Sequence, residues 1–306
     1  MSAKIPRLLT LPDNRLRVLA PAKLNLGLRV FPLRPDGFHP LETWMVPTSW
    51  HDTLTFIPDT PLQLKVTGRS EGIPTEIDKN LIGRAATKLA AHANIQPTGT
   101  IELHKVLPPG GGLGGGSSDA ANTLVALNTL WGLHLPEQTL IDIAASLGSD
   151  IPFFVPNIAA LCTGRGEIMT PLRGTRSLFA VLIIPPQGCP TKEIFQAFDA
   201  PNDLQHYSES RRAKKTDWES LTQLSAPELL RELVNDLEPP AFHVAPWLAE
   251  LRNEAARIAG QPIHMTGSGS TLFTLTDSGA DANTLQQQLE SHLPATHAVI
   301  PTKLQV

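Results

Sequence analysis

The sequence predicts an α+β protein of two domains, and three observations lead to this fold class. The chain has 306 residues, a length that favours two domains over one. Hydrophobic residues make up 41% and charged residues 18%, which is ordinary for a globular protein with sizeable cores. Strand and helix patterns are grouped rather than strictly alternating, which favours α+β over a doubly wound sheet. We expect the first domain over residues 1–165 and the second over residues 166–306.

The first half of the chain shows strand patterns with one clear helix. Residues 16–31 alternate loosely between apolar and polar, which predicts a strand, an interruption and a second strand. An Asp-Gly pair within residues 34–40 then marks a turn. The elements expected next are strands at 52–57 and 62–68, an alanine-rich helix at 80–93 and a strand at 99–107.

The second half is richer in helices. A buried helix is expected from Ser117 to Trp131, and another opens at Pro136. The other expected elements are a hairpin at 157–172, a buried strand at 177–186, helices at 226–236 and 246–260, a strand pair at 264–276, and a last helix with a terminal strand. Residues 199–218 are polar without periodicity, which predicts a surface loop. We interpret its basic cluster, Arg211–Lys215, as a solvated face.

Charge, cysteines and histidines exclude several classes of protein. The net charge of −4 argues against a nucleic-acid partner. Cys162 and Cys189 cannot form a zinc site alone; two separate buried thiols are favoured, with one bridge left open. The ten histidines show no metal-ligand spacing, so no structural zinc is expected. No secretory signal, transit peptide or membrane-length apolar run is evident, and we expect a cytoplasmic protein without membrane partners.

The most informative stretch is "PPGGGLGGGSSDAA", at residues 108–121. Six of the seven residues from Gly110 to Gly116 are glycine, and a buried helix follows. Backbone amides at a helix N-terminus bind anions, and missing side chains let phosphate oxygens approach. Ser117 and Ser118 add hydroxyl donors or magnesium ligands, and Asp119 is placed to cap the helix.

Three phosphate-loop interpretations compete for this stretch. The Walker pattern requires a Gly-Lys-Ser/Thr ending, and the stretch contains no lysine. The dinucleotide pattern matches at Gly110, Gly112 and Gly115, but a match is nearly guaranteed here, and no acidic residue closes a second strand about twenty residues on. The third interpretation, a proline-started glycine loop running into Ser-Ser at a helix start, fits. A flexible linker is disfavoured, since linkers do not usually end at a buried apolar helix.

Three further stretches carry candidate chemistry for phosphoryl transfer. "PAKLNLGL" places Lys23 beside a predicted strand end, and "LGSDIPFF" places Asp150 in a turn after a helix. "MTGSGSTLF" offers a second glycine turn at Gly267 and Gly269. Taken singly, each has an ordinary interpretation as a surface lysine, a turn residue or a hairpin turn.

Together, these four stretches resemble the GHMP kinases, the superfamily of galactokinase, homoserine kinase, mevalonate kinase and phosphomevalonate kinase. Within it, the match is closest to the 4-diphosphocytidyl-2-C-methyl-D-erythritol kinase family. The stretches "AKLNL", "RPDGFHPLET", "KNLIGRAA", "GGGLGGGSSDAANTL", "LGSDIPFF" and "CTGRGEIMTPL" select this family. The resemblance runs from about residue 18 to about residue 275. It implies two α+β domains, the first binding ATP, with the active site in the cleft between them.

The resemblance also implies a reaction and a set of residues. ATP, with Mg²⁺, would phosphorylate the 2-hydroxyl of cytidyl-diphosphate-linked methylerythritol in non-mevalonate isoprenoid precursor biosynthesis. Asp150 matches the catalytic aspartate, Lys23 the lysine beside it and Asn25 an asparagine near the substrate. The expected ATP-binding residues are Pro108, Gly110, Gly111, Gly112, Leu113, Gly114, Gly115, Gly116, Ser117, Ser118, Asn80, Lys105 and Val106. No dedicated metal ligands are expected beyond Ser117 or Ser118.

The cytosine pocket implied by the resemblance uses an aromatic ring and a histidine. The family's "DGYH" reads "DGFH" here, so Phe38 retains stacking without a hydroxyl, and His39 is the hydrogen-bonding group. Phe195 is chosen as the second ring, with Phe198 the weaker candidate. Left open are a GHMP kinase for homoserine or mevalonate, a non-catalytic nucleotide-binding relative and a dinucleotide-dependent oxidoreductase. The oligomeric state, a homodimer included, is also open.

Overall fold

The chain forms two compact units, each assembled from separate stretches. The computed structural model describes residues 7–200 and 216–306, so the predicted loop at 199–218, with its basic cluster Arg211–Lys215, falls mostly outside the described residues. Unit 1 comprises Met1–Ala22, Trp50–Pro109 and Gly114–Asn157. Unit 2 comprises Lys23–Ser49, Gly110–Leu113 and Ile158–Val306. Strands β2 (Leu16–Val30) and β3 (Leu41–Pro61) contribute residues to both units, so the chain passes from one unit to the other several times.

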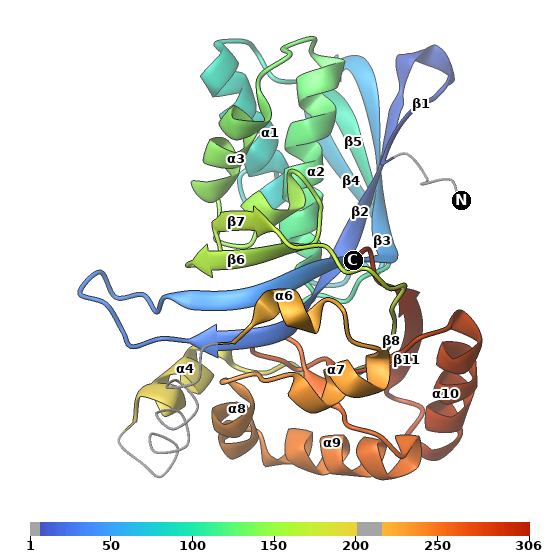
Figure 1. Cartoon of the computed structure of the whole chain (residues 1–306). Coiled ribbons are helices and arrows are strands. Elements are labelled where there is room, and N and C mark those ends of the chain that lie inside the picture. The colour runs from blue at the N-terminus through green and yellow to red at the C-terminus, as the bar shows by residue number, and fades with distance from the viewer. Residues whose placement is uncertain (1–6, 201–215) are drawn as a thin grey trace. The chain divides into compact units, whose positions relative to one another are not determined.

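Unit 1 is a sheet with three helices beside it (Figure 1). Its strands are β1 (Leu8–Thr10), the first part of β2, the second part of β3, β4 (Gln63–Gly68) and β5 (Thr98–Lys105), in the order β1-β2-β3-β5-β4. β3 pairs with β5 antiparallel, and β4 pairs with β5 parallel. Its helices are α1 (Leu81–Ala93), α2 (Gly115–Leu130) and α3 (Glu137–Ala145), with the 3-10 turns η1 (Pro12–Asn14) and η2 (Pro152–Phe154).

The helices of unit 1 form where capping and small side chains favour them. The Asn80 side chain accepts a hydrogen bond from the Ile82 amide at 2.9 Å and so caps α1. The buried alanines of α1, Ala85 and Ala86, let it pack closely on α2. Most residues of α2 from Ser118 to Leu127 are buried, as the sequence predicts.

Unit 2 is built around a four-stranded antiparallel sheet in the order β11-β8-β10-β9. These strands are β8 (Phe179–Ile184), β9 (His264–Met265), β10 (Leu272–Thr276) and β11 (Ala298–Lys303). A separate hairpin of β6 (Ala160–Gly164) and β7 (Ile168–Pro171) pairs with the start of β3. The helices are α4 (Thr191–Asp199), α6 (Trp218–Leu221), α7 (Ala226–Glu232), α8 (Glu238–Val244), α9 (Pro246–Ala259) and α10 (Gly279–His292).

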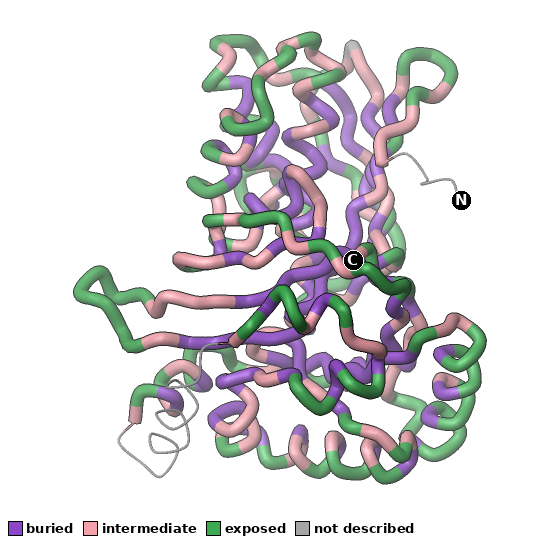
Figure 2. The backbone as a smooth tube through the Cα atoms, viewed as in Figure 1, coloured by how far each residue is buried: buried purple, intermediate pink, exposed green. Residues whose placement is uncertain are grey.

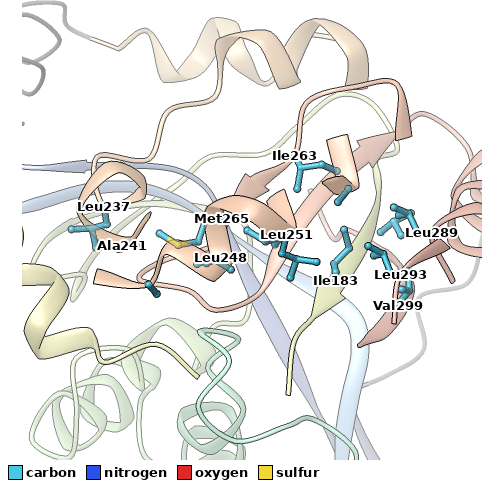
Figure 3. Close-up of a cluster of buried hydrophobic side chains, with 14 of the residues drawn as sticks. Ile183, Leu237, Ala241, Leu248, Leu251, Ile263, Met265, Leu289, Leu293 and Val299 are labelled. Atoms are coloured by element: carbon cyan, nitrogen blue, oxygen red, sulfur yellow. The ribbon is translucent and has the colours of Figure 1, made fainter. Parts of the chain in front are cut away.

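One hydrophobic cluster joins the helices of unit 2 to its sheet (Figure 3). Leu248 and Leu251 of α9 and Leu289 of α10 pack with strand residues such as Ile183 and Val299. Figure 2 shows how burial is distributed along the chain: the central strands are buried, while the outer faces of the helices are exposed. The cluster makes unit 2 a well-packed support for the polar residues that border it.

The α+β class and most predicted elements are confirmed, but several details were wrong. β2 is one continuous strand, because residues 20–30 are buried throughout and need no alternation. β3 begins at Leu41, well before the predicted strand at 52–57. α2 begins at Gly115 with Gly114 as its N-cap, so Asp119 lies inside the helix and caps nothing. α4, α6 and α8 were not predicted.

Both cysteines lie within the described residues. Cys162 and Cys189 are both free; Cys162 is buried as expected, whereas Cys189 is half-buried. Across residues 7–200 and 216–306, no helix combines the length and apolarity needed to cross a bilayer. Within the same residues, His, Cys, Asp and Glu side chains form no cluster fit for a metal ion.

Candidate active site

The glycine segment, residues 110–116, alternates between two backbone conformations. Gly110, Gly112 and Gly114 have φ values of 78°, 74° and 71°, a left-handed region that favours glycine. Gly114 is the N-cap of α2, and the first helical bond runs from the Ser118 amide to the Gly114 carbonyl at 2.8 Å. The amides of residues 115–117 precede that bond and are the unsatisfied donors of a helix start. This is the local structure that binds anions.

Individual glycines serve different purposes. A Cβ on Gly112 would lie 2.8 Å from the Gly269 carbonyl oxygen, so Gly112 allows the two glycine turns of unit 2 to pack together. A Cβ on Gly110 would meet nothing within 4 Å, and one on Gly116 only Leu81 at 3.9 Å. Gly110 and Gly116 therefore leave open space, while Gly112 is required by packing.

Lys23 lies in a buried polar cluster of unit 2. It is 4% exposed, and its Nζ donates to the Asn25 Oδ1 at 2.5 Å. The Lys23 backbone amide donates to the Leu113 carbonyl at 2.9 Å, which ties this strand to the glycine segment. The predicted pair Lys23 and Asn25 is therefore brought together with the first part of the glycine segment.

Two threonines that the sequence did not single out hold Asn25 in place. The Asn25 side-chain amide donates to Thr43 Oγ1 at 2.8 Å, and Thr43 donates onward to the Gly27 carbonyl at 2.7 Å. The Asn25 backbone amide donates to Thr266 Oγ1 at 2.9 Å. With the rotamer of Asn25 fixed, the ammonium of Lys23 has a fixed partner.

The second glycine turn, Gly267 to Gly269, lies against the same cluster. A Cβ on Gly267 would be 3.2 Å from Asn25 Oδ1 and 3.5 Å from Lys23 Nζ. Asn235 supports the turn, since its side-chain amide donates to the Met265 and Gly267 carbonyls, each at 2.8 Å. Gly267 therefore permits a close approach of backbone to the lysine.

Lys105 occupies a buried ionic cluster of unit 1. Its Nζ donates to Asp52 Oδ2 at 2.5 Å and to Asp119 Oδ2 at 2.8 Å, and all three side chains are at least 96% buried. Asp52 also accepts from the Val106 and Leu107 amides at 2.6 and 2.8 Å. The predicted nucleotide residues Lys105 and Val106 are thus fixed by an aspartate that the sequence did not single out.

The two carboxylates of this cluster are not equally well stabilised. Burial opposes the charged form of Lys105, but Asp119 and Asp52 outweigh it and raise the Lys105 pKa. Burial raises the pKa of Asp119 to about 7, against the opposing effect of Lys105. Among the described residues, Asp119 Oδ1 is a buried oxygen with no hydrogen-bond partner. The cluster is ordered but carries one poorly accommodated carboxylate.

The remaining predicted residues of unit 1 differ in accessibility. Asp150 is half-buried in the turn between α3 and η2. Ser117 is half-buried, whereas Ser118 is fully buried and lies 3.3 Å from the Asn122 side-chain amide. Asn80 uses both ends of its side chain, because its amide nitrogen also donates to the Pro74 carbonyl. Ser117 therefore presents the more accessible hydroxyl.

Phe38, His39 and Phe195 belong to one region of unit 2. His39 stacks on Phe195 with ring centroids 5.4 Å apart, while Phe198 meets it edge-on and belongs to the hydrophobic core. His39 Nδ1 donates to the Phe31 carbonyl at 2.8 Å, and Nε2 lies 3.2 Å from Asp199 Oδ2, so both ring nitrogens have a partner. Phe38 is 46% exposed, with the Arg165 guanidinium 4.5 Å from its ring centre.

A helix-start glycine segment, a buried lysine tied to it and two α+β units agree with the architecture that the resemblance to GHMP kinases implies. The chain matches the models "GHMP kinases N terminal domain" over residues 80–156 and "GHMP kinases C terminal" over residues 218–295. It belongs to the family of 4-diphosphocytidyl-2-C-methyl-D-erythritol kinases, as its relatives show.

Relatives of that name cover nearly the whole chain. The kinase of Salinispora arenicola is 37% identical over 90% of this chain and 88% of its own length. That of Cupriavidus necator is 40% identical over 92% of this chain and 90% of its own length. A crystal structure of 4-(cytidine 5'-diphospho)-2C-methyl-D-erythritol kinase matches with a TM-score of 0.73 and 31% identity, over 95% of this chain and 99% of that one. A homoserine kinase from Cytophaga hutchinsonii, at 16% identity and a TM-score of 0.68, shares the fold.

Proposed function

We propose that this protein transfers the γ-phosphoryl group of ATP to the 2-hydroxyl of 4-diphosphocytidyl-2-C-methyl-D-erythritol, a step of non-mevalonate isoprenoid precursor biosynthesis. The observation that carries the proposal is the family relationship, 37% identity over 90% of the chain, combined with the retained Lys23 cluster. We further propose that the enzyme acts in the cytoplasm. In the sequence, the boundary between the ATP-binding and C-terminal domains is proposed near residues 165–166.

The glycine segment fits the phosphates of a nucleotide. Open space at Gly110 and Gly116, and the unsatisfied amides at the start of α2, support binding of anionic oxygens there. Pro108, Gly111, Leu113 and Gly115 are proposed as further nucleotide-binding residues of the segment. Asn80, Lys105 and Val106 are proposed to border the nucleotide through the backbone that they hold in place.

Lys23 and Asp150 are proposed as the catalytic residues. Asp150 takes the proton of the substrate hydroxyl, and Lys23 holds that hydroxyl and stabilises developing negative charge. The bond from Lys23 to Asn25 supports this role, because it orients the ammonium through a neutral amide oxygen and that bond leaves the positive charge in place. The proposal requires both groups to reach the same hydroxyl.

Magnesium would be supplied with ATP and would neutralise charge on the transferring phosphoryl group. Ser117 is the side chain of this chain best suited to contact it, since its hydroxyl is accessible whereas that of Ser118 is buried. No dedicated carboxylate site is proposed.

The substrate base is proposed to lie at Phe38 and His39. Phe38 offers an exposed ring for stacking, and Phe195, the less buried of the two candidate phenylalanines, contributes the second ring. His39 would turn Nε2 from Asp199 Oδ2 to the base, while Nδ1 keeps its bond to the Phe31 carbonyl. The lost tyrosine hydroxyl removes a polar contact but leaves the aromatic face.

A substrate panel tests the proposal. ADP release would be measured with ATP, Mg²⁺ and 4-diphosphocytidyl-2-C-methyl-D-erythritol, and separately with methylerythritol phosphate, homoserine and mevalonate. We expect turnover with the cytidylated alcohol alone, and none with the Asp150→Asn variant, which should still bind ATP. Preference for an uncytidylated alcohol would reject the substrate, and near-normal turnover by Asp150→Asn would reject the base.

A further inference from the structure

Arg7, which precedes β1, connects α2 with the turn that carries Asp150. Its Nε donates to Asn122 Oδ1 of α2 at 2.6 Å. On the other side, Nη1 donates to the Val155 carbonyl at 2.6 Å, and Nη2 donates to the Phe154 carbonyl. These acceptors lie 115 to 148 residues further along the chain, and all of them belong to unit 1. One guanidinium therefore joins two elements of unit 1 that carry parts of the candidate active site.

Residues 148–155, the Asp150 segment, form a series of tight turns with a buried apolar side. The Phe154 amide donates to the Ile151 carbonyl at 3.1 Å, and both residues are at most 1% exposed, whereas Asp150 is half-buried. The last two carbonyls of the segment lie at the end of these turns, where helical backbone needs donors from elsewhere. By donating to both carbonyls, Arg7 fixes the end of the segment that begins beside Asp150.

On the other side, Arg7 is tied to the start of α2 through Asn122. Asn122 is fully buried, and its Nδ2 donates to the Ser118 carbonyl at 2.8 Å. Because this bond directs the amide nitrogen toward Ser118, the Oδ1 atom is turned toward Arg7. Ser118 itself makes the first helical bond of α2, to the Gly114 carbonyl. A line of hydrogen bonds therefore runs from the N-cap of α2 to the Asp150 segment.

The charge and shape of the Arg7 side chain suit this connection. Burial lowers the pKa of Arg7 to about 10, and Glu137 at the start of α3 opposes this shift, so the guanidinium is a cation at neutral pH. Hydrogen bonds from a cation are shorter and stronger than those between neutral groups. A planar guanidinium also holds its donors in fixed directions, which a lysine ammonium does not. Arg7 can therefore set the geometry between α2 and the Asp150 segment.

We infer that Arg7 is a positioning residue for phosphoryl transfer, which holds the Asp150 segment in a fixed place relative to the start of α2. This inference rests on the proposed function, since it takes Asp150 as the base and the start of α2 as the phosphate site. Arg7 acts through these two elements, so that the alcohol held at Asp150 meets the γ-phosphate in line. Arg7 precedes the stretch that resembles the kinase family, which begins at about residue 18, so the resemblance implies no role for it.

A positioning role predicts which kinetic constant changes. A displacement of about 1 Å between reacting groups can cost about 100-fold in rate. The amides at the start of α2 belong to the helix itself, and ATP keeps them when Arg7 is replaced. Loss of the connection should therefore lower kcat and leave both KM values nearly unchanged.

Steady-state kinetics of three variants test the inference. Arg7→Lys keeps the positive charge but cannot hold three acceptors in one plane. Asn122→Ala removes the connection on the α2 side and leaves Arg7 on the Asp150 segment. Arg17→Lys is the matched control, an exposed arginine on β2 of the same unit. Titration of each protein with a non-hydrolysable ATP analogue counts the folded nucleotide sites, and kcat is expressed per site.

We expect Arg7→Lys to lower kcat per site by about 10- to 100-fold, with KM for ATP and for the cytidylated alcohol within about twofold of wild type. Arg17→Lys should match wild type. The double variant of Arg7→Lys and Asn122→Ala should be no slower than the slower single variant, because both remove one connection. Unchanged kcat per site in Arg7→Lys would overturn the inference. So would a loss that appears only as fewer folded sites, or losses that multiply in the double variant.

Hydrogen exchange supplies a measurement that does not depend on activity. Amides of residues 148–155 should exchange faster in Arg7→Lys than in wild type, while those of α10 in unit 2 should not change. Equal exchange of the Asp150 segment in both proteins would overturn the inference. Asn122→Ala takes the place of Arg7→Lys in both measurements if the latter does not fold. Absence of turnover by wild type would instead reject the proposed function, and exchange would still show whether Arg7 holds the segment.

Discussion

Two buried lysines border the glycine segment, and they are held in opposite ways. In unit 2, Lys23 bonds to the neutral amide oxygen of Asn25, within a cluster that threonines keep in place. In unit 1, Lys105 is clamped by two carboxylates. The bond to Asn25 orients the Lys23 ammonium and does not neutralise its charge. The Lys105 ammonium is paired with Asp52, which also fixes the backbone amides of Val106 and Leu107. Both lysines are buried, so burial alone does not separate the role proposed for Lys23 from the structural role of Lys105.

Replacing Lys23 by Met should give the largest effect on activity. The apolar chain fills similar volume, but the positive charge at the reacting hydroxyl is lost, which should reduce kcat by about 10³-fold. The melting temperature should fall modestly, because the buried Asn25 Oδ1 loses its bond to Lys23 while Asn25 keeps its bonds to Thr43 and Thr266. Steady-state kinetics and thermal melting measure the two quantities; a variant that is active but unstable would reverse the roles assigned to the two lysines.

Lys105→Met should have the largest effect on stability. Two buried carboxylates would lose their shared counter-ion, at a cost of about 3–5 kcal/mol. Chemical denaturation at pH 8 measures this loss, and lowering the pH should recover part of it as Asp119 takes up a proton. A loss under 1 kcal/mol, with a large drop in kcat, would show that Lys105 acts in the reaction rather than in the fold.

Phe38→Ala tests the substrate side of unit 2. The ring is 46% exposed, so stability should change little, while loss of base stacking should weaken substrate binding by about 1–3 kcal/mol, or roughly 5- to 150-fold. KM for ATP should stay within about twofold. Comparing the two KM values checks this, and equal increases in both would mean that Phe38 supports the structure instead of the base.

The smallest effect is expected at Gly116, on the unit 1 side of the glycine segment. Gly116→Ala places a methyl group in open space at a helical position, which should stabilise the helix by up to about 1 kcal/mol while crowding the phosphate approach. Gly112→Ala is the contrasting variant, because its new Cβ would meet a carbonyl at 2.8 Å and destabilise unit 2. Melting temperature and ATP affinity, measured for both variants, distinguish a glycine needed for packing from one needed for binding. An unchanged ATP affinity in Gly116→Ala would show that the phosphates do not bind at Gly116.

The sequence predicted those parts of the site that lie in short continuous stretches. Lys23 and Asn25 share one strand, and the glycine segment is contiguous, so local patterns were enough. Thr43, Thr266 and Asp52 were missed, because their partners are far along the chain and nothing local marks an ordinary threonine or aspartate. Asp119 was misassigned as a cap because the helix begins at Gly115, and glycine in a first turn gives no propensity signal.

The bond between the Asn25 amide and Thr266 links positions 241 residues apart. During synthesis, all residues of unit 1 have been added by Asn157, whereas the Lys23 cluster has to await Thr266, near the end of the chain. A nascent chain would thus have the residues of the α2 start available long before those that fix Asn25 and pack on Gly112, so the order of synthesis separates the completion of the two units.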